Sequence, residues 1–127
     1  MSDNFKKIAV DPAAARTELH DALGLTGCEA SINKLPAGAA VPFVHKHNQN
    51  EELYGVLAGS GEIYMDGTVY PLAAGDWFVV RPEGHRAIRA LEGGMTFICV
   101  QTKAGSLEGF TMTDGVMCEG EKAPWLK

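Results

Sequence analysis

The sequence predicts an all-β protein built as a small sandwich or barrel. Short runs of alternating, β-branched and aromatic residues follow one another through the chain after Gly27. Turn-forming sequences such as LPAG, AGSG, AAGD and RPEG separate these runs. The runs recur about every 8–12 residues, a spacing typical of sandwiches and barrels.

The N-terminal part differs, because its composition favours a helix. In the run VDPAAARTELHDALG, residues 10–24, Asp11 can cap the first turn and Pro12 is suited to it. The alanines have high helix propensity, and Gly24 can end the helix. We therefore expect one short helix before residue 25.

Eight strands are expected after this helix, each bounded by turn residues. The pair Asp66-Gly67 stands between two of these runs and is a strong signal for a tight hairpin. The expected strands cover residues 29–35, 43–47, 53–58, 61–65, 68–72, 77–81, 85–91 and 95–102.

Length and composition indicate a single domain of ordinary globular type. The chain has 127 residues, of which 46% are hydrophobic and 21% charged. A chain of this length can bury a core without disulfides or structural zinc. We expect one domain over residues 1–127, with an N-terminal arm and helix over 1–27. The C-terminal tail, 106–127, is expected to pack as an arm on the barrel or on a second subunit.

Charge and cysteine content exclude several classes of protein. The net charge of -5 argues against nucleic-acid binding and against anionic membrane surfaces. No apolar run approaches the length of a bilayer span, and the N-terminus lacks the apolar core of a signal peptide. The cysteines are Cys28, Cys99 and Cys118, an odd number without a CxxC pair, which indicates a reduced cytoplasmic protein. Cys99 lies in an apolar run and is expected to be buried.

Two histidines one residue apart mark a candidate metal site. On a strand, His45 and His47 would project from the same face, about 7 Å apart at the backbone, with Lys46 on the other face. Glu52 begins the next expected strand, and an adjacent strand would bring its carboxylate beside the two rings. Two histidines and one carboxylate can bind a metal and leave positions open for a ligand. The competing interpretation is that both histidines are surface residues of a polar strand.

The spacing of these residues resembles the first motif of the cupin superfamily. The run G-x(6)-H-x-H-x(4)-E-x(6)-G extends from Gly38 to Gly59, and the family pattern has one residue fewer before the first histidine. The second family motif resembles GDWFVVRPEGHRAIRA, in which Gly75, Pro82 and Gly84 match in order with one extra residue before the proline. The resemblance implies a jelly-roll β-barrel, often dimeric, with a divalent metal inside.

The resemblance implies that His45, His47 and Glu52 are metal ligands, and it leaves the fourth ligand open. The family's histidine aligns either with His85 or with Arg86. Alternation favours an inward Arg86, because Arg86 shares a face with an isoleucine. An inward Arg86 would either pair with Glu52 in a metal-free polar core or bind an anionic substrate. A further alternative places both residues in water at the barrel rim.

Two aromatic residues are candidates to contact a small-molecule ligand together with Arg86. Tyr54 shares a strand face with Glu52, and Phe43 shares one with the two histidines. Each could instead pack in the core.

Three functions are compatible with these residues. The first is a metal-dependent enzyme, such as an oxygenase or isomerase, acting on a small molecule. The second is a non-catalytic module that binds a small ligand, and the third is a metal-free barrel. The cofactor expected is a divalent transition metal, namely Fe, Mn, Ni, Zn or Co. A homodimer is expected because the sheet edges and the apolar residues of both terminal segments need a covering surface.

Overall fold

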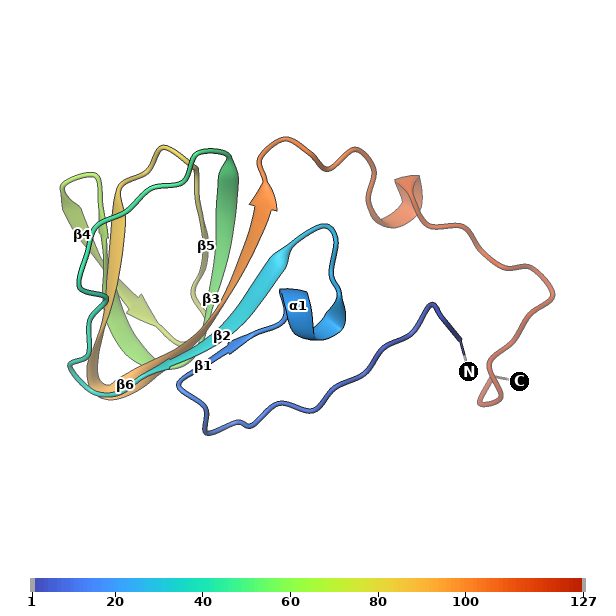
Figure 1. Ribbon diagram of the computed structural model, residues 1–127, viewed down its shortest axis with the longest axis horizontal. Coiled ribbons are helices and arrows are strands. Elements are labelled where there is room, and N and C mark those ends of the chain that lie inside the picture. Colours follow the sequence, from blue (N-terminus) through green and yellow to red (C-terminus); the bar gives the residue numbers. More distant parts are fainter. Residues whose placement is uncertain (1, 127) are drawn as a thin grey trace.

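The computed structural model describes residues 2–126 and shows a strand-rich barrel with extended segments at both ends (Figure 1). Antiparallel strands dominate, which confirms the all-β prediction. In the described part of the chain the elements are β1 (Arg16–Glu18), α1 (His20–Leu23), β2 (Glu29–Leu35), β3 (Asn50–Met65), β4 (Thr68–Ala73), β5 (Trp77–Val80), β6 (Arg86–Lys103) and a 3₁₀ turn (Thr111–Thr113).

Two long strands, β3 and β6, form the framework of the barrel. The sheet order is β1-β2-β6-β3-β4, and β5 pairs with the first half of β3. The turn residues at 59–60 and 92–94 had predicted a break in each long strand. The structure shows continuous strands with register shifts between Val56 and Ala58 and between Gly59 and Gly61. These bulges bend the sheet, so that the two halves of each long strand contribute to different walls.

The bend depends on close backbone contact at Gly59. Its φ of +80° is in the left-handed region, and a Cβ there would lie 2.0 Å from the carbonyl oxygen of Gly94. Gly94 has φ +76°, and its Cβ would lie 2.6 Å from the carbonyl oxygen of Leu35. The two glycines therefore allow β2, β3 and β6 to approach one another at the bend.

The predicted hairpin at Asp66-Gly67 is confirmed. It connects β3 to β4, and both residues have positive φ, +47° and +95°, as a type I′ turn requires. The Asp66 carboxylate also accepts a hydrogen bond from the backbone N–H of His85 at 2.8 Å. The turn is thereby tied to the start of β6.

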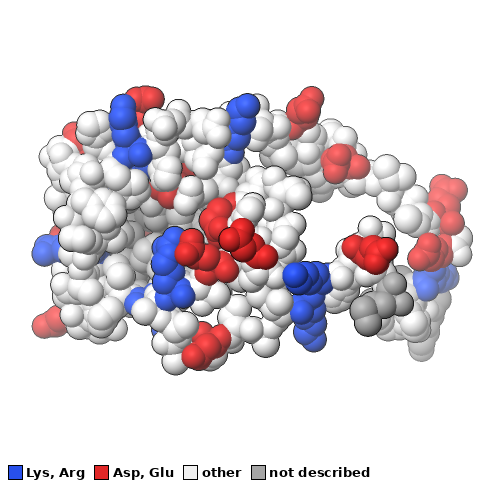
Figure 2. Space-filling model, viewed as in Figure 1, with Lys and Arg blue, Asp and Glu red and all other residues white. Residues whose placement is uncertain are grey.

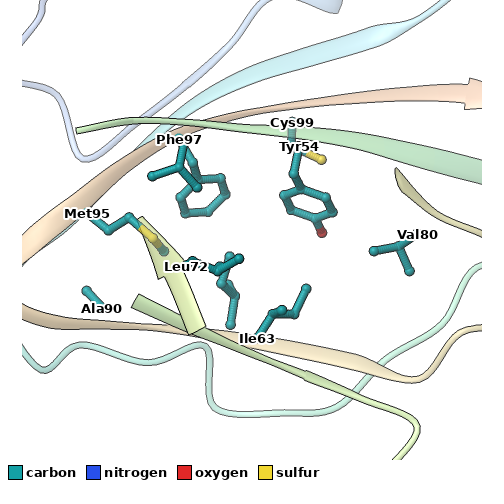
Figure 3. Close-up of a cluster of buried hydrophobic side chains, with 10 residues drawn as sticks. Tyr54, Ile63, Leu72, Val80, Ala90, Met95, Phe97 and Cys99 are labelled. Carbon is teal, nitrogen blue, oxygen red and sulfur yellow. The ribbon is translucent and has the colours of Figure 1, made fainter. Parts of the chain in front are cut away.

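The barrel interior is filled by side chains from alternate strand positions. Figure 3 shows the cluster, in which Tyr54 points its hydroxyl inward, Phe97 packs beside it, and Met95 lies on the other side of Phe97. The Tyr54 and Phe78 rings stack with centroids 4.9 Å apart. The buried hydrophobic set is Tyr54, Val56, Ile63, Leu72, Val80, Ile88, Ala90, Met95, Phe97 and Cys99.

The short helix predicted before residue 25 is present, but its extent within residues 10–24 is wrong. Only His20–Leu23 is helical, and Arg16–Glu18 forms β1 on the edge of β2. Asp11 caps a turn rather than a helix, because its carboxylate accepts from the N–H of Ala13. Pairing with the exposed edge of β2 has overridden the local helix propensity. Gly24 ends the short helix in the left-handed conformation, as expected.

The strand expected at residues 43–47 is also absent from the described structure. The segment makes two isolated bridges to β6, Ala40 with Arg89 and His45 with Arg86. Three prolines and glycines, at 36, 38 and 42, interrupt regular pairing around it.

The two terminal segments extend away from the barrel (Figure 1). Most side chains of residues 106–126 are exposed, and the tail does not pack on the barrel as one alternative had predicted. Figure 2 shows the gap between this tail and the rest of the molecule, and acidic and basic side chains interspersed on the same face. Within residues 2–126, the structure contains no helix long and apolar enough to span a membrane.

We expect Gly59→Ala to lower the thermal midpoint strongly, because the new Cβ meets the Gly94 carbonyl and also forces alanine to a positive φ. Gly75→Ala is the matched control, since Gly75 has φ +97° and a Cβ added there would have nothing within 4 Å. The control carries only the backbone strain, about 1–3 kcal/mol. Differential scanning calorimetry should show a larger loss for Gly59→Ala, and equal losses would contradict the close-contact explanation.

Candidate functional site

His45, His47 and Glu52 converge on one point inside the barrel. One ligand atom from each of the three lies within 4.8 Å of the others. Nε2 of His47 is 3.3 Å from Oε2 of Glu52, and the two imidazole rings have centroids 5.3 Å apart. Glu52 is buried, with only 4% of its surface exposed. The structure therefore places together the three residues that the spacing predicted.

The two histidines are held in place by backbone hydrogen bonds to Arg86, the first residue of β6, and to Pro82, which lies just before it. His45 and Arg86 exchange a pair of backbone hydrogen bonds, each 3.0 Å long, and the His47 N–H donates to the carbonyl oxygen of Pro82. This narrow pairing keeps both imidazoles on the inner side although no strand forms. Glu52 comes from β3, which pairs with the other end of β6.

Tyr54 and Cys99 hold the Glu52 carboxylate in place. The Tyr54 hydroxyl donates to Oε1 at 2.7 Å, and the Cys99 thiol donates to Oε2 at 3.3 Å. These two residues are directly opposite in the β3–β6 register. Burial, reinforced by the nearby carboxylate, raises the pKa of Tyr54 and raises the pKa of Cys99 to about 12. Both groups therefore keep the protons that they donate.

Arg86 lies inside the barrel, as strand alternation predicted, with 1% of its surface exposed. One of its terminal nitrogens donates to the Arg81 carbonyl oxygen at 2.7 Å, and the other lies 3.7 Å from Oε1 of Glu52. That second nitrogen and Nε have no hydrogen-bond partner among the described residues. Arg86 does not line the cavity described below, so its expected contact with a substrate is not supported.

His85 lies outside the site. Its side chain is exposed, and it is not part of the group formed by His45, His47 and Glu52. The next residue, Arg86, is the first of β6, and its side chain points inward. Because successive side chains of a strand point to opposite faces, His85 points to solvent. The geometry does not bring His85 to the position of a fourth metal ligand.

The site has the features of a metal centre. Nδ1 of His45 and Nε2 of His47 are buried without a hydrogen-bond partner among the described residues. Burial lowers the pKa of His45, with the Glu52 charge opposing that shift, so its ring favours the neutral form that binds metals. Two imidazole nitrogens and a carboxylate suit a divalent first-row transition metal. The residues present therefore fit such an ion.

A cavity of about 310 Å³ opens beside this group. Tyr54 lines it, and Phe43 stands at its mouth, 58% exposed, with its ring edge against His45 at a centroid distance of 5.6 Å. The complete lining is Arg16, Ser31, Asn33, Leu35, Val41, Phe43, His45, His47, Glu52, Tyr54, Ile88, Phe97, Cys99 and Gln101.

The sequence did not predict three polar residues of this lining, namely Arg16, Ser31 and Asn33. Arg16 was assigned to a helix, and its position at the cavity depends on β1 pairing with β2. Ser31 and Asn33 are polar residues at alternate positions of β2, and this alternation was the one available signal that they share a face.

Comparison with known proteins identifies the family. A protein-family profile described as "Cupin domain" matches residues 32–101. A crystal structure of a cupin protein from Bacteroides fragilis is 56% identical, with 92% of this chain and 99% of that chain covered and a TM-score of 0.88. The chain therefore belongs to the cupin family.

More distant structures share the fold. KdgF from Halomonas sp. is 21% identical, with 81% of this chain and 90% of that chain covered and a TM-score of 0.62. A Cupin 2 conserved barrel domain protein from Salinispora arenicola is 17% identical, with 79% and 90% covered and a TM-score of 0.66. A search of curated protein sequences found no match.

We expect Tyr54→Phe to destabilise the metal-free protein by about 1.5–3 kcal/mol, because the buried carboxylate loses a hydrogen-bond donor. Tyr70→Phe is the control, since Tyr70 is 52% exposed and remote from Glu52 in the strand register. Urea unfolding would measure both. A Tyr54→Phe value no larger than that of the control would show that the hydroxyl does not stabilise Glu52.

Proposed function

We propose that this chain binds a divalent transition metal through His45, His47 and Glu52, and that a small molecule binds in the adjacent cavity. The observation that carries the proposal is the pair of buried, unpartnered imidazole nitrogens beside a buried carboxylate. Burying such polar atoms without a partner is costly, and an ion that accepts their lone pairs removes that cost. Three protein ligands leave coordination positions open.

The two oxygens of Glu52 support this proposal over a metal-free polar core. Oε1 accepts from Tyr54 and faces Arg86, whereas Oε2 faces His47. The separation between Arg86 and Oε1, 3.7 Å, is too long for a hydrogen bond. Arg86 thus contributes a positive charge behind the carboxylate, and Oε2 remains directed toward the histidines.

The site suits an enzyme that acts on a small molecule, such as an oxygenase or an isomerase. A metal held by two histidines and one carboxylate supplies Lewis-acid or redox chemistry at its open positions. The protein contributes a cavity whose walls are largely apolar, with Tyr54, Phe97 and Ile88 excluding water from one side. A non-catalytic ligand carrier would use the same cavity, and turnover assays separate the two.

We expect about one divalent ion per chain after purification without chelators, measured by inductively coupled plasma mass spectrometry. His47→Ala should lose the ion, because one of three ligands is removed. His85→Ala is the matched control and should retain it, since His85 lies on the exposed side. Full metal content in His47→Ala would refute the assigned site, and loss in His85→Ala would restore His85 as a ligand.

We further propose that the chain forms a homodimer through the outer face of β3 and β5. Leu53, Leu57, Trp77 and Val79 are 43–54% exposed on neighbouring strands. The Trp77 ring lies flat on the backbone at Gly55, where a Cβ would come within 2.3 Å of the ring. The large apolar area is typical of an interface.

A second copy of the chain suits this face because the charges at its end are balanced. Glu51 and Arg81 form an ion pair, 2.8 Å long, beside the apolar residues. This pair is contained within one copy, so these two side chains bring no net charge against a second copy at this edge. The exposed apolar residues of the terminal segments, such as Phe110 and Trp125, would gain cover in the same assembly.

We expect light scattering to give a dimer at micromolar concentration and Trp77→Glu to give a monomer, because the new carboxylate would be buried without a partner. Thr68→Glu adds the same charge at an exposed position on β4 and should leave the dimer intact. A monomeric parent protein would contradict the proposal, as would dimers of unchanged stability in Trp77→Glu.

A further inference from the structure

The cavity has a second polar group on its wall, contributed by β1 and β2. Arg16 lies opposite Asn33 in the strand register, and its guanidinium donates to the Asn33 side-chain oxygen at 2.5 Å. The Asn33 amide nitrogen in turn donates to the Ser31 hydroxyl at 3.0 Å. Ser31 and Asn33 are 3% and 5% exposed. This chain of hydrogen bonds, anchored on two buried residues of β2, orients the arginine at the cavity wall.

Arg16 has donors available for a ligand. A guanidinium carries five N–H groups, and the contacts of Arg16 are the bond to Asn33 and an ion pair to Glu18 at 3.7 Å. Its side chain is 51% exposed, so a ligand can reach it from the cavity mouth. Among the described residues that line the cavity, Arg16 is the one lysine or arginine.

The balance of charge around the cavity favours an anion. Arg86 is buried behind Glu52 and offsets the carboxylate's single negative charge. Glu18 lies 3.7 Å from Arg16 and offsets part of its charge, so a divalent metal would supply the positive excess at this site. This local sign is opposite to that of the whole chain, whose net charge is -5. The net charge of the whole chain would repel anions, so a preference for anions would have to come from the residues at the cavity.

We propose that Arg16 binds a carboxylate group of the ligand, so that the cavity selects small organic acids. The proposal rests on the proposed function, because it assumes that this cavity is the ligand site. The planar guanidinium can make two parallel hydrogen bonds to a carboxylate. The volume of about 310 Å³ is at the small end for ligand pockets and suits a small acid.

The test is a binding screen with a paired library, in which each small carboxylic acid is accompanied by its uncharged primary amide. Ligand-observed NMR on the full-length protein detects binding without any assay of activity, and titration of the hits gives affinities. We expect acids to bind more tightly than their amides. Arg16→Gln should weaken the acids about 10-fold to 100-fold and leave the amides unchanged, because a charge-assisted hydrogen bond is lost.

Two further variants control for charge and for geometry. Arg89→Gln removes an equal charge from an exposed arginine paired with Glu62 on β3, and it should keep the preference for acids. Arg16→Lys keeps the charge without the planar fork and should recover part of the affinity. Equal binding of acids and amides, an absence of acid hits, or an unchanged preference in Arg16→Gln would overturn the proposal.

Measuring the metal content of each sample separates this inference from the metal proposal. Protein that holds metal but shows no preference for acids would refute the role of Arg16 and leave the metal site standing. Protein without metal that still prefers acids in an Arg16-dependent manner would support the role of Arg16 and refute the metal proposal.

Discussion

The buried carboxylate of Glu52 is the group on which the interior of this barrel depends. A negative charge with 4% of its residue surface exposed must be compensated by donors or by opposite charge. The protein supplies Tyr54 and Cys99 as donors and Arg86 as a countercharge. These groups come from β3 and β6, so the compensation of one charge requires that the two long strands pair in a single register.

The same pairing explains why the polar groups of the site differ in their roles. Tyr54 and Cys99 remain protonated, because burial and the nearby carboxylate raise the pKa of each. They can hold Glu52 but cannot compete with it for a cation. Nδ1 of His45 and Nε2 of His47 make no such hydrogen bond, and Nε2 of His47 lies 3.3 Å from Oε2, the Glu52 oxygen that Cys99 also contacts. The site thus combines groups that hold Glu52 with imidazole nitrogens that are available to bind an ion.

The cavity wall carries two groups of polar side chains. The first is the imidazoles and carboxylate of the His–Glu group, and the second is the hydrogen-bonded group of Arg16, Asn33 and Ser31. Apolar side chains such as Phe97 and Ile88 line the same cavity. A small ligand that carries both an acidic group and a metal-binding atom would match this lining.

The sequence by itself determined the all-β class, the hairpin at Asp66-Gly67 and the three residues of the His–Glu group. These features depend on local spacing: His45 and His47 are two residues apart in an extended segment, and the turn type requires positive φ at two adjacent residues. The inward orientation of Arg86 also followed from alternation. Each of these signals is contained within a few residues of chain.

Only the tertiary structure decided where β1 lies and which side chains complete the cavity. The alanine-rich run has helix propensity, but an unpaired edge of β2 offers it backbone hydrogen bonds that a local reading of the sequence does not include. The same is true of the continuity of β3 through Gly59, which depends on contact with Gly94 from 35 residues further along the chain. Arg16 reaches the cavity, and Arg86 is hidden from it, because distant strands fix their positions.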